Sequence, residues 1–289
     1  MYYSALIGKP TTHSVSPLMY EEFAKTVLRG SEYKHLKIDV SVDELDNALL
    51  AFKTLKFIGV NVTLPHKMAV MNFIDEIDPI ATAVGAVNTI TFTSKTIGHN
   101  TDWKGIYIPV QKYIAHKSLN LNKATILGSG GAARAAIYAC RELNIKQINV
   151  VYREDANDKQ LADLKHNAKR HNIELFTYAQ VGRLINDAQL VINGTSAGMV
   201  GNELTPFELT ELENIDLTGK IFLDAVFNPI NTPLLKYFKE RNAYTIDGLW
   251  MMIYQGVYAL SLWLGYSIDF SDERLIEIHK LLEKELLHV

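Results

Sequence analysis

Four short polar segments carry the residue types in this chain that are best suited to chemistry. They read HSVSP at residues 13–17, NVTLPHK at 61–67, GAVNT at 85–89 and HNTDW at 99–103, each beside an apolar run. In an α/β sheet, ligands bind at the carboxyl ends of the strands. The four segments therefore predict a binding site built from hydroxyl, amide and charged side chains.

The segment GVNVTLPHK is unusual because an apolar strand breaks off into Pro65, His66 and Lys67. Pro65 cannot extend a strand ladder, and its fixed φ suits the first turn of a helix, which we expect to begin near His66. Lys67 has two interpretations: a solvated lysine at a helix start, or a group that acts on a ligand. A positioned ammonium stabilises negative charge developing on an oxygen and can then deliver a proton.

Apolar runs alternate with helical patterns from the first residue onward, as in YYSALIG followed by PLMYEEFAKTVL. This alternation predicts βαβ units and mostly parallel sheets. Two extended pieces, NTITF and KTIGH, predict a hairpin or edge pair that closes the first sheet. The alternation restarts after residue 118, so we expect an α/β protein with two sheets.

A glycine-rich turn, in TILGSGGAARAAI, follows the first strand of the second sheet and precedes an alanine-rich helix. Gly128 permits the tight turn, Gly130 lets the backbone approach a pyrophosphate, and Ala133 allows close packing of helix on strand. The helix N-terminus offers an anion free amide groups and a favourable dipole. These features predict a dinucleotide site, with a purely structural turn as the alternative. Its candidate residues are Gly128, Ser129, Gly130, Gly131 and Ala132.

Arg153, Glu154 and Asp155 follow the next predicted strand. A carboxylate at this point holds a ribose 2′-hydroxyl, whereas an arginine accommodates a 2′-phosphate. Arg153 suits phosphate or adenine, while Glu154 and Asp155 would repel a phosphate. The cofactor is therefore expected to be NAD or NADP, with NAD favoured; solvated loop charges are the alternative interpretation.

The two sheets suggest a division of the chain into functional regions. We expect a substrate and catalytic domain at residues 1–104, a Rossmann-like dinucleotide-binding domain at 105–246, and two helices at 247–289 that pack on the first domain. The last helix is amphipathic and packs either internally or on a partner, so the oligomeric state is left open.

Composition excludes several other classes of function. The 289 residues are 48% hydrophobic and 21% charged with a net charge of −3, which is ordinary for a soluble globular protein and gives no electrostatic footprint for nucleic acid. The single cysteine, Cys140, fits a reducing cytoplasm and offers neither a disulfide nor a cysteine metal site, and no metal is expected. We expect no secretory signal, and the apolar window 249–264 is too short and too interrupted for a membrane span.

Several separated motifs, in order, resemble the shikimate dehydrogenase family, including its branch that also oxidises quinate. They are the glycine turn, NGTSAGM at 193–199, DAVFNP at 224–229 and DGLWMMIYQG at 247–256. The resemblance covers essentially the whole chain. It implies an oxidoreductase that transfers a hydride between a nicotinamide cofactor and C3 of 3-dehydroshikimate, a cyclohexene carboxylic acid, or of the related cyclohexane acid quinate.

The resemblance also implies roles for individual residues. Lys67 and Asp102 would form the catalytic pair. Because a carboxylate near an amine favours its charged form, Asp102 is expected to orient Lys67 and to bond to a substrate hydroxyl. Substrate contacts are implied for Ser14, Ser16, Thr63, Asn88 and Gln255. Contacts near the nicotinamide are implied for Met199, Ala225 and Gly248.

The chain departs from the family pattern at two places. Phe227 stands where members usually carry a tyrosine whose hydroxyl reaches the substrate, and YREDAN supplies acids where NADP-using members carry basic residues. The loss of the hydroxyl leaves room for an alternative function, a ligand-sensing regulatory protein without turnover. Retention of both Lys67 and Asp102 argues against that alternative.

Overall fold

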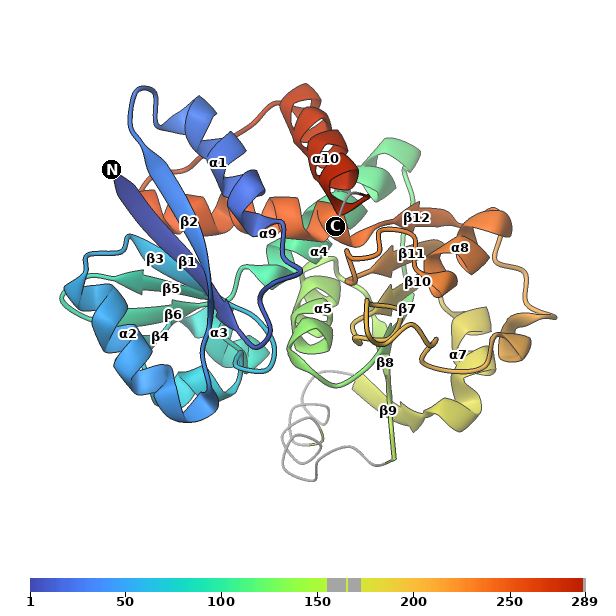
Figure 1. Ribbon diagram of the computed structural model, residues 1–289. Coiled ribbons are helices and arrows are strands. Elements are labelled where there is room, and N and C mark those ends of the chain that lie inside the picture. The colour runs from blue at the N-terminus through green and yellow to red at the C-terminus, as the bar shows by residue number, and fades with distance from the viewer. Residues whose placement is uncertain (155–164, 166–172, 288–289) are drawn as a thin grey trace. The chain divides into compact units, whose positions relative to one another are not determined.

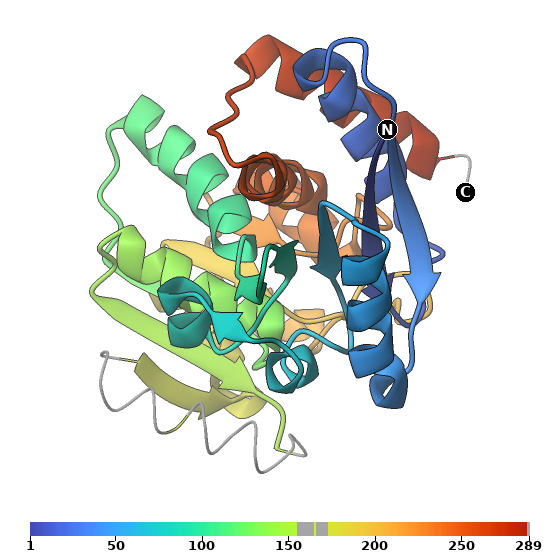
Figure 2. The same ribbon diagram turned by 90° about the vertical axis from the view of Figure 1, so that its left-hand side faces the viewer.

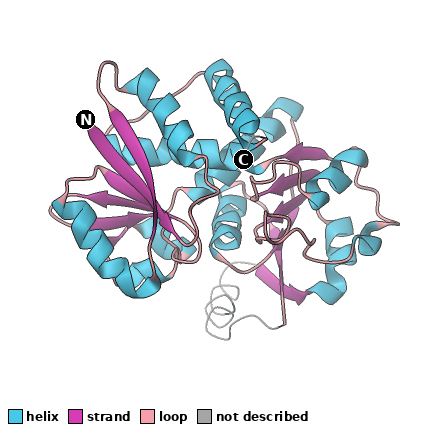
Figure 3. Cartoon of the chain, viewed as in Figure 1, coloured by secondary structure: helices cyan, strands magenta, loops and turns pink. Residues whose placement is uncertain are grey.

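The computed structural model describes residues 1–154, 165 and 173–287, so the candidate residue Asp155 lies outside the described residues. Contacts divide the chain into two compact units, Met1–Asp102 with Ile253–Val289, and Trp103–Met252. The chain passes between them at the start of α4 (Asp102–Lys117) and within α9 (Gly248–Leu264). The boundaries expected after residues 104 and 246 fall in the first turn of α4 and just before α9. Each unit is a sheet flanked by helices, which confirms the expected α/β class (Figure 3).

The first unit contains a six-stranded mixed sheet in the order β2-β1-β3-β5-β6-β4. The pairs β1/β2, β1/β3 and β4/β6 are parallel, whereas β3/β5 and β5/β6 are antiparallel. Its elements outside α4 and α9 are β1 (Tyr2–Gly8), α1 (Ser16–Val27), β2 (Tyr33–Asp39), η1 (Val42–Glu44), α2 (Leu45–Thr54), β3 (Gly59–Val62), η2 (Ala69–Asn72), β4 (Glu76–Ile77), α3 (Pro79–Val84), β5 (Thr89–Phe92), β6 (Thr96–His99) and α10 (Asp272–Leu286).

Helices cover both faces of this sheet. Alternate strand residues such as Ile7 and Val60 pack with Leu49 and Phe52 of α2, which lies along one face in Figures 1 and 2. On the other face, the Trp263 indole of α9 donates a 3.0 Å hydrogen bond to the Ile90 carbonyl and occupies the space where a Cβ at Gly59 would lie. These contacts place the end of α9 on the first sheet.

The prediction that a helix begins near His66 is wrong. Residues 64–68 form turns and are followed by the short 3-10 helix η2. One helix-like bond occurs, from the Val70 amide to the His66 carbonyl at 2.9 Å, but the Lys67 carbonyl accepts the Val87 amide at 2.8 Å instead. The segment around Lys67 is therefore tied to the loop that leads into β5 and does not continue as an α-helix.

The hairpin expected around residues 87–99 is present as β5 and β6, paired in register from Thr89 with His99 to Phe92 with Thr96. It does not close the sheet, because the two-residue strand β4 pairs with β6 and forms the edge. A two-residue strand gives too weak a pattern to be predicted from sequence.

The second unit contains a six-stranded sheet in the order β12-β11-β10-β7-β8-β9, and all of its pairs are parallel. Its strands are β7 (Lys123–Leu127), β8 (Gln147–Tyr152), β9 (Ile173–Thr177), β10 (Leu190–Asn193), β11 (Ile221–Asp224) and β12 (Tyr244–Ile246). Its further helices are α5 (Gly131–Glu142), η3 (Tyr178–Gln180), α7 (Val181–Asp187), η4 (Leu209–Leu212) and α8 (Pro233–Glu240).

The strand order of the second sheet reverses at β7, which pairs with β8 on one side and β10 on the other. Dinucleotides bind at such a switch point, at the carboxyl ends of the strands. Buried residues of α7 and α8, including Ile185 and Phe238, pack with Phe222 on one face of this sheet. Within the described part of the chain, no helix is long and apolar enough to cross a membrane.

Candidate active site

Strand register brings three of the polar segments together at one edge of the first sheet. Because β3 and β5 are antiparallel, the end of β3 lies beside the start of β5, with Asn61 opposite Thr89. Because β5 and β6 are also antiparallel, the end of β6 lies at the same edge, with Thr89 opposite His99. Lys67 follows β3, Asn88 precedes β5 and Asp102 follows β6, so all three meet there.

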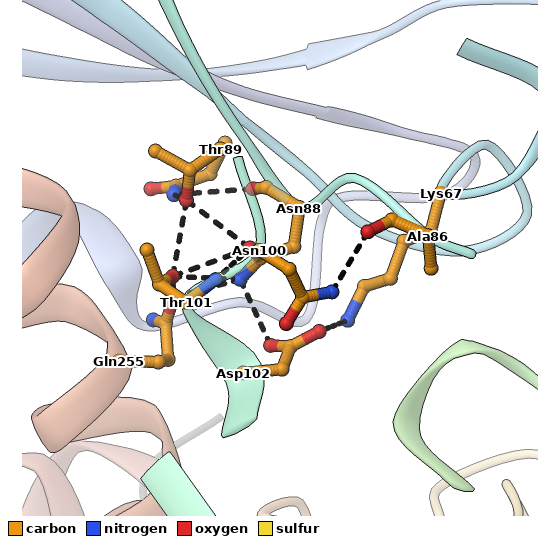
Figure 4. Close-up of polar contacts among 9 residues, drawn as sticks. Lys67, Ala86, Asn88, Thr89, Asn100, Thr101, Asp102 and Gln255 are labelled. Atoms are coloured by element: carbon orange, nitrogen blue, oxygen red, sulfur yellow. Dashed lines mark hydrogen bonds and ion pairs between the residues drawn. The ribbon is translucent and has the colours of Figure 1, made fainter. Parts of the chain in front are cut away.

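Lys67 and Asp102, the pair implied by the family resemblance, are in direct contact (Figure 4). Lys67 Nζ lies 2.7 Å from Asp102 Oδ2, and the two side chains are only 16% and 6% exposed. A charge-assisted hydrogen bond with this little solvent exposure is stronger than a surface ion pair. The ammonium is thus held in a fixed position while remaining partly accessible.

Asn88 is the centre of the polar network around this pair. Its Nδ2 lies 2.9 Å from Asp102 Oδ1, 2.9 Å from Thr101 Oγ1 and 3.2 Å from Gln255 Oε1. Its Oδ1 accepts the Thr101 amide at 2.6 Å. Asn88, expected to bond to substrate hydroxyls, is therefore also the residue that holds the second oxygen of Asp102.

Three further residues of this network, Asn61, Thr89 and Thr101, lie in the polar segments expected to form the binding site, but none of them was assigned a role from the sequence. Asn61 Nδ2 lies 3.2 Å from Thr89 Oγ1, which lies 3.1 Å from Thr101 Oγ1. All three are buried. Their sequence signal is their place in the polar segments 61–67, 85–89 and 99–103, and the strand register is needed to show which residues of these segments contact one another.

Ser14, Ser16 and Thr63 lie in the same unit. Ser14 Oγ donates to Ser16 Oγ at 3.0 Å and accepts the Ser16 amide at 3.2 Å, at the start of α1. The Thr63 amide bonds to the Ile7 carbonyl at 2.8 Å, and its methyl group packs over Gly8, so it is fixed at the ends of β1 and β3. Among the described residues, no hydrogen bond joins these three side chains to Lys67 or Asp102.

The two histidines beside these segments differ in environment. His13 is exposed, whereas His66 is buried and its Nε2 lies 2.7 Å from the Val40 carbonyl. A carbonyl oxygen only accepts, so His66 is the donor. His66 therefore ties the loop that carries Lys67 to the segment after β2.

The glycine turn in the second unit leads into α5 and leaves open space beside Gly130. Gly128 has φ +105°, which favours glycine, and a Cβ there would lie 2.9 Å from Thr195 Cγ2. Nothing lies within 4 Å of a Cβ built on Gly130, and Gly130 caps α5 without a side-chain hydrogen bond. The turn and the first amide groups of α5 therefore fit an anion bound at the helix N-terminus.

The close packing expected of Ala133 is present, because a Cβ on Gly194 would lie 2.8 Å from the Ala133 Cα. Ser129 is half-buried in this turn, and the first two residues of α5 are the buried Gly131 and the half-buried Ala132. Arg153 and Glu154 are exposed at the end of β8.

Two of the residues expected near the nicotinamide, Met199 and Ala225, lie on neighbouring loops of the second unit, residues 193–199 and residues 224–232, and the third, Gly248, begins α9. The Ala225 amide bonds to the Asn193 carbonyl at 2.9 Å. Met199 ends the first loop and forms a bridge with Asn202. A Cβ on Gly248 would lie 2.3 Å from the Val226 carbonyl oxygen, so the start of α9 approaches the second loop closely.

Comparison with known proteins identifies the family. A family model described as the shikimate dehydrogenase substrate binding domain matches residues 6–90. A curated shikimate dehydrogenase (NADP(+)) from Nostoc sp. is 36% identical over 265 residues, which cover 90% of this chain and 89% of the relative. The chain belongs to the shikimate dehydrogenase family.

Solved structures of shikimate dehydrogenase relatives share the fold. Shikimate 5-dehydrogenase from Listeria monocytogenes, crystallised with shikimate and NAD, matches with a TM-score of 0.79 at 28% identity, covering 98% of this chain and 96% of its own. Quinate dehydrogenase from Corynebacterium glutamicum, in complex with NAD, gives 0.80 at 28% identity, covering 98% and 99%. The family and fold expected from the sequence are both confirmed.

No three His, Cys, Asp or Glu side chains in the described ranges form a group suited to holding a metal ion.

Asp224 is a buried acid that sequence reasoning did not single out. It ends β11 and is fully buried. Its Oδ1 accepts Asn193 Nδ2 at 2.9 Å and the Val226 amide at 3.0 Å, and its Oδ2 accepts Thr232 Oγ1 at 2.6 Å. Burial nevertheless raises the pKa of Asp224 to about 6.

Stability of the second unit is expected to depend on pH through Asp224. The pKa of about 6 in the folded chain lies above the ordinary 3.8, so the native state binds this proton more tightly than the unfolded chain. The contribution of this proton to the free energy of unfolding is complete below pH 3.8, the ordinary pKa, and is lost as the pH rises through about 6. A shift of two pKa units corresponds to roughly 3 kcal/mol. Thermal unfolding of the wild type and of Asp224→Asn, compared from about pH 4 to pH 8, should show the wild-type Tm falling relative to the variant. A difference in Tm that stays constant with pH would contradict this prediction.

Proposed function

We propose that this protein oxidises shikimate at C3, and reduces 3-dehydroshikimate in the reverse direction, with a nicotinamide dinucleotide as the hydride carrier. The observation that carries the proposal is the 2.7 Å contact between Lys67 Nζ and Asp102 Oδ2 at a sheet edge lined by Asn88, Thr101 and Gln255. Membership of the shikimate dehydrogenase family supports it.

Side chains of this protein are proposed to supply the proton to the C3 oxygen and to stabilise the negative charge on it. During reduction, negative charge develops on that oxygen, and the Lys67 ammonium stabilises the charge and donates the proton. Asp102 accepts from Lys67 with one oxygen and from Asn88 with the other, so the ammonium is aimed before substrate binds. Ser14 and Ser16 are proposed to hold the carboxylate, while Thr63, Asn88 and Gln255 are proposed to bond to ring hydroxyls.

The cofactor would be held by the second unit. The Gly128–Ala132 turn and the N-terminus of α5 would bind the pyrophosphate, and the loops with Met199 and Ala225, together with Gly248, would flank the nicotinamide. When bound, the nicotinamide supplies or accepts the hydride.

An assay with four substrate and cofactor combinations tests the proposed function. Purified protein is mixed with shikimate or quinate and with NAD or NADP, and the absorbance of reduced nicotinamide is followed. Turnover with shikimate that is lost in Lys67→Ala supports the enzyme, and turnover with quinate adds the second substrate. If no combination exceeds the Lys67→Ala control, the chain is a ligand-binding protein without turnover and the proposal is wrong.

We further propose that NAD is the preferred cofactor, because Glu154 and Asp155 follow Arg153 where a 2′-phosphate would otherwise lie. The names of curated relatives specify NADP, so this preference rests on the chain's own acids. Asp155→Ala is expected to raise the Kd for NAD several-fold, because a hydrogen-bond acceptor for the ribose diol is lost, which is worth about 1 kcal/mol. The Kd for NADP should stay unchanged or fall, because the repulsion of its 2′-phosphate is lost at the same time. Titration calorimetry with both cofactors measures this, with the exposed Asp216→Ala as the control. Equal losses for NAD and NADP would show that Asp155 does not discriminate between them, and unchanged Kd values for both would place it outside the site.

A further inference from the structure

The Asp224 carboxylate contacts three separate segments at the carboxyl ends of β10 and β11. Asn193 is the first residue of the 193–199 loop, the Val226 amide belongs to the 224–232 loop, and Thr232 caps α8 by accepting the Leu235 amide at 3.1 Å. One fully buried side chain therefore joins the two loops and the start of the following helix.

Asn193 and Thr232 extend this connection along the 193–199 loop. Asn193 Oδ1 accepts the Thr195 hydroxyl at 2.7 Å, and the Thr195 oxygen accepts the Ala197 amide at 3.1 Å. Gly198 has φ +94°, and a Cβ there would lie 3.1 Å from Thr232 Cβ, so the two loops are also in close contact farther along. The course of the loop up to Met199 thus depends on the groups that Asp224 orders.

The charge on Asp224 has no cationic partner among the contacts of the described residues. Its three partners are an amide side chain, a backbone amide and a hydroxyl, and the ionisable group that affects it is another acid, Asp247. A buried carboxylate opposed by an acid is costly, and an apolar or neutral group would suit stability better. What the carboxylate provides is two oxygens that accept from three donors at once, which a neutral amide cannot do.

We propose that Asp224 is a positioning residue that fixes the 193–199 and 224–232 loops against each other and so shapes the binding site for the nicotinamide half of the cofactor. The inference rests on the proposed function, since Met199 and Ala225 are assigned to the nicotinamide side there. It assigns Asp224 no contact with the cofactor. The adenosine half, bound at the Gly128–Ala132 turn, is expected to be unaffected.

The test compares binding of the whole dinucleotide with binding of ADP-ribose, which lacks the nicotinamide. Titration calorimetry is run on the full chain without substrate, using NAD, NADP and ADP-ribose. Asp224→Asn replaces one acceptor oxygen by an NH₂ group, so either an amide donor loses its acceptor or the Thr232 hydroxyl must accept from the NH₂ group and loses its own acceptor. The variant is expected to weaken binding of the preferred dinucleotide by about tenfold or more, because small misplacements of binding groups are costly. ADP-ribose should bind within about twofold of the wild type.

Thr232 provides variants that leave the carboxylate in place. Thr232→Val removes the hydroxyl at nearly constant shape and should reproduce the selective loss, whereas Thr232→Ser keeps the hydroxyl and should restore dinucleotide binding. Thr232→Val also removes a helix cap, so Ser271→Ala, which removes the side-chain cap of α10 in the other unit, is the control for lost stability alone. Ser271→Ala should leave both affinities unchanged.

The pH dependence gives a second readout that a merely structural role would not produce. Below about pH 6 the Asp224 carboxyl carries a proton, and the protonated oxygen donates where it had accepted, so the bond that it received from Thr232 or from an amide group is reversed or lost. As the pH is lowered from about 8 to about 5, the affinity for the dinucleotide relative to that for ADP-ribose should therefore fall in the wild type. In Asp224→Asn this ratio should stay constant. Asp247 is the other titratable group that faces this site, and Asp247→Asn should keep the fall.

Each outcome decides the inference. A selective loss for the dinucleotide in Asp224→Asn and Thr232→Val, with rescue in Thr232→Ser, supports it. Equal losses for dinucleotide and ADP-ribose, or unchanged affinities, overturn it while leaving the proposed function intact. Wild-type protein that binds neither NAD nor NADP overturns the inference and the proposed function together. Should Asp224→Asn fail to fold, the Thr232 variants decide alone.

Discussion

Replacing Lys67 by alanine is expected to lower kcat for shikimate oxidation by at least about a hundredfold, the low end for removal of a general acid or of a charge stabiliser. The ammonium is 16% exposed and lies 2.7 Å from Asp102, so a solvent cation or another lysine cannot readily replace it in the same position. Steady-state rates at saturating shikimate and cofactor measure the effect. KM for the cofactor should change little, because the cofactor is proposed to bind in the second unit.

Two further lysine variants make this result specific. Lys95→Ala removes an exposed lysine of the same unit that pairs with Glu76, and kcat should stay near the wild-type value because exposed ion pairs contribute little. Lys67→Arg keeps a charge but does not release a proton near neutral pH. Activity of the arginine variant near that of alanine would assign the proton to Lys67, whereas substantial recovery would assign it a mainly electrostatic role. Near-normal turnover in Lys67→Ala would mean that neither the proton nor the charge stabilisation comes from Lys67.

Asp102→Asn is the second substitution with a large expected effect, again at least about a hundredfold in kcat. The carboxylate accepts from Lys67 with one oxygen and from Asn88 with the other. An asparagine has one acceptor and one NH₂ group, so in either amide orientation its NH₂ faces a donor. The ammonium therefore loses both its counter-charge and its fixed direction, although the shape of the side chain is almost unchanged.

The control for this substitution is Asp46→Asn, an exposed acid in the first turn of α2, which should leave kcat unchanged. Circular dichroism and the Tm show whether Asp102→Asn is folded. A folded variant with wild-type kcat would show that Asn88 and the backbone suffice to orient Lys67. A rise in KM for shikimate alone, with kcat retained, would instead make Asp102 a substrate-binding group.

The parts of the fold that were predicted depend on local pattern. Alternating apolar and helical stretches reveal each strand and helix independently of distant contacts, and the turn at Gly128 carries its own backbone requirement, φ +105°. The hairpin at β5 and β6 was recognisable because both strands and the turn lie within a dozen residues or so. The pairing of Lys67 with Asp102 came from family resemblance, because nothing local connects residues so far apart.

The parts that were missed depend on which strands are neighbours. Asn61, Thr89 and Thr101 are ordinary polar residues until the register places them around Asn88. Asp224 follows three apolar residues and resembles a solvated strand end, whereas it is fully buried among donors from three segments. The residues around His66 are typical of a helix start, but the Lys67 carbonyl accepts the Val87 amide from the loop before β5, so no α-helix forms there. Tertiary hydrogen bonds decided each of these cases.

The antiparallel hairpin determines where this chain can tolerate changes of length. Asn88 and Asp102 stand at its open end, whereas the Thr93–Lys95 turn closes the opposite end. A peptide tag or a longer connection inserted at that tip would leave the spacing of Asn88 and Asp102 at the open end unchanged. A single extra residue within either strand would instead shift the pairing and turn its following side chains to the other face, which separates Asp102 from Asn88.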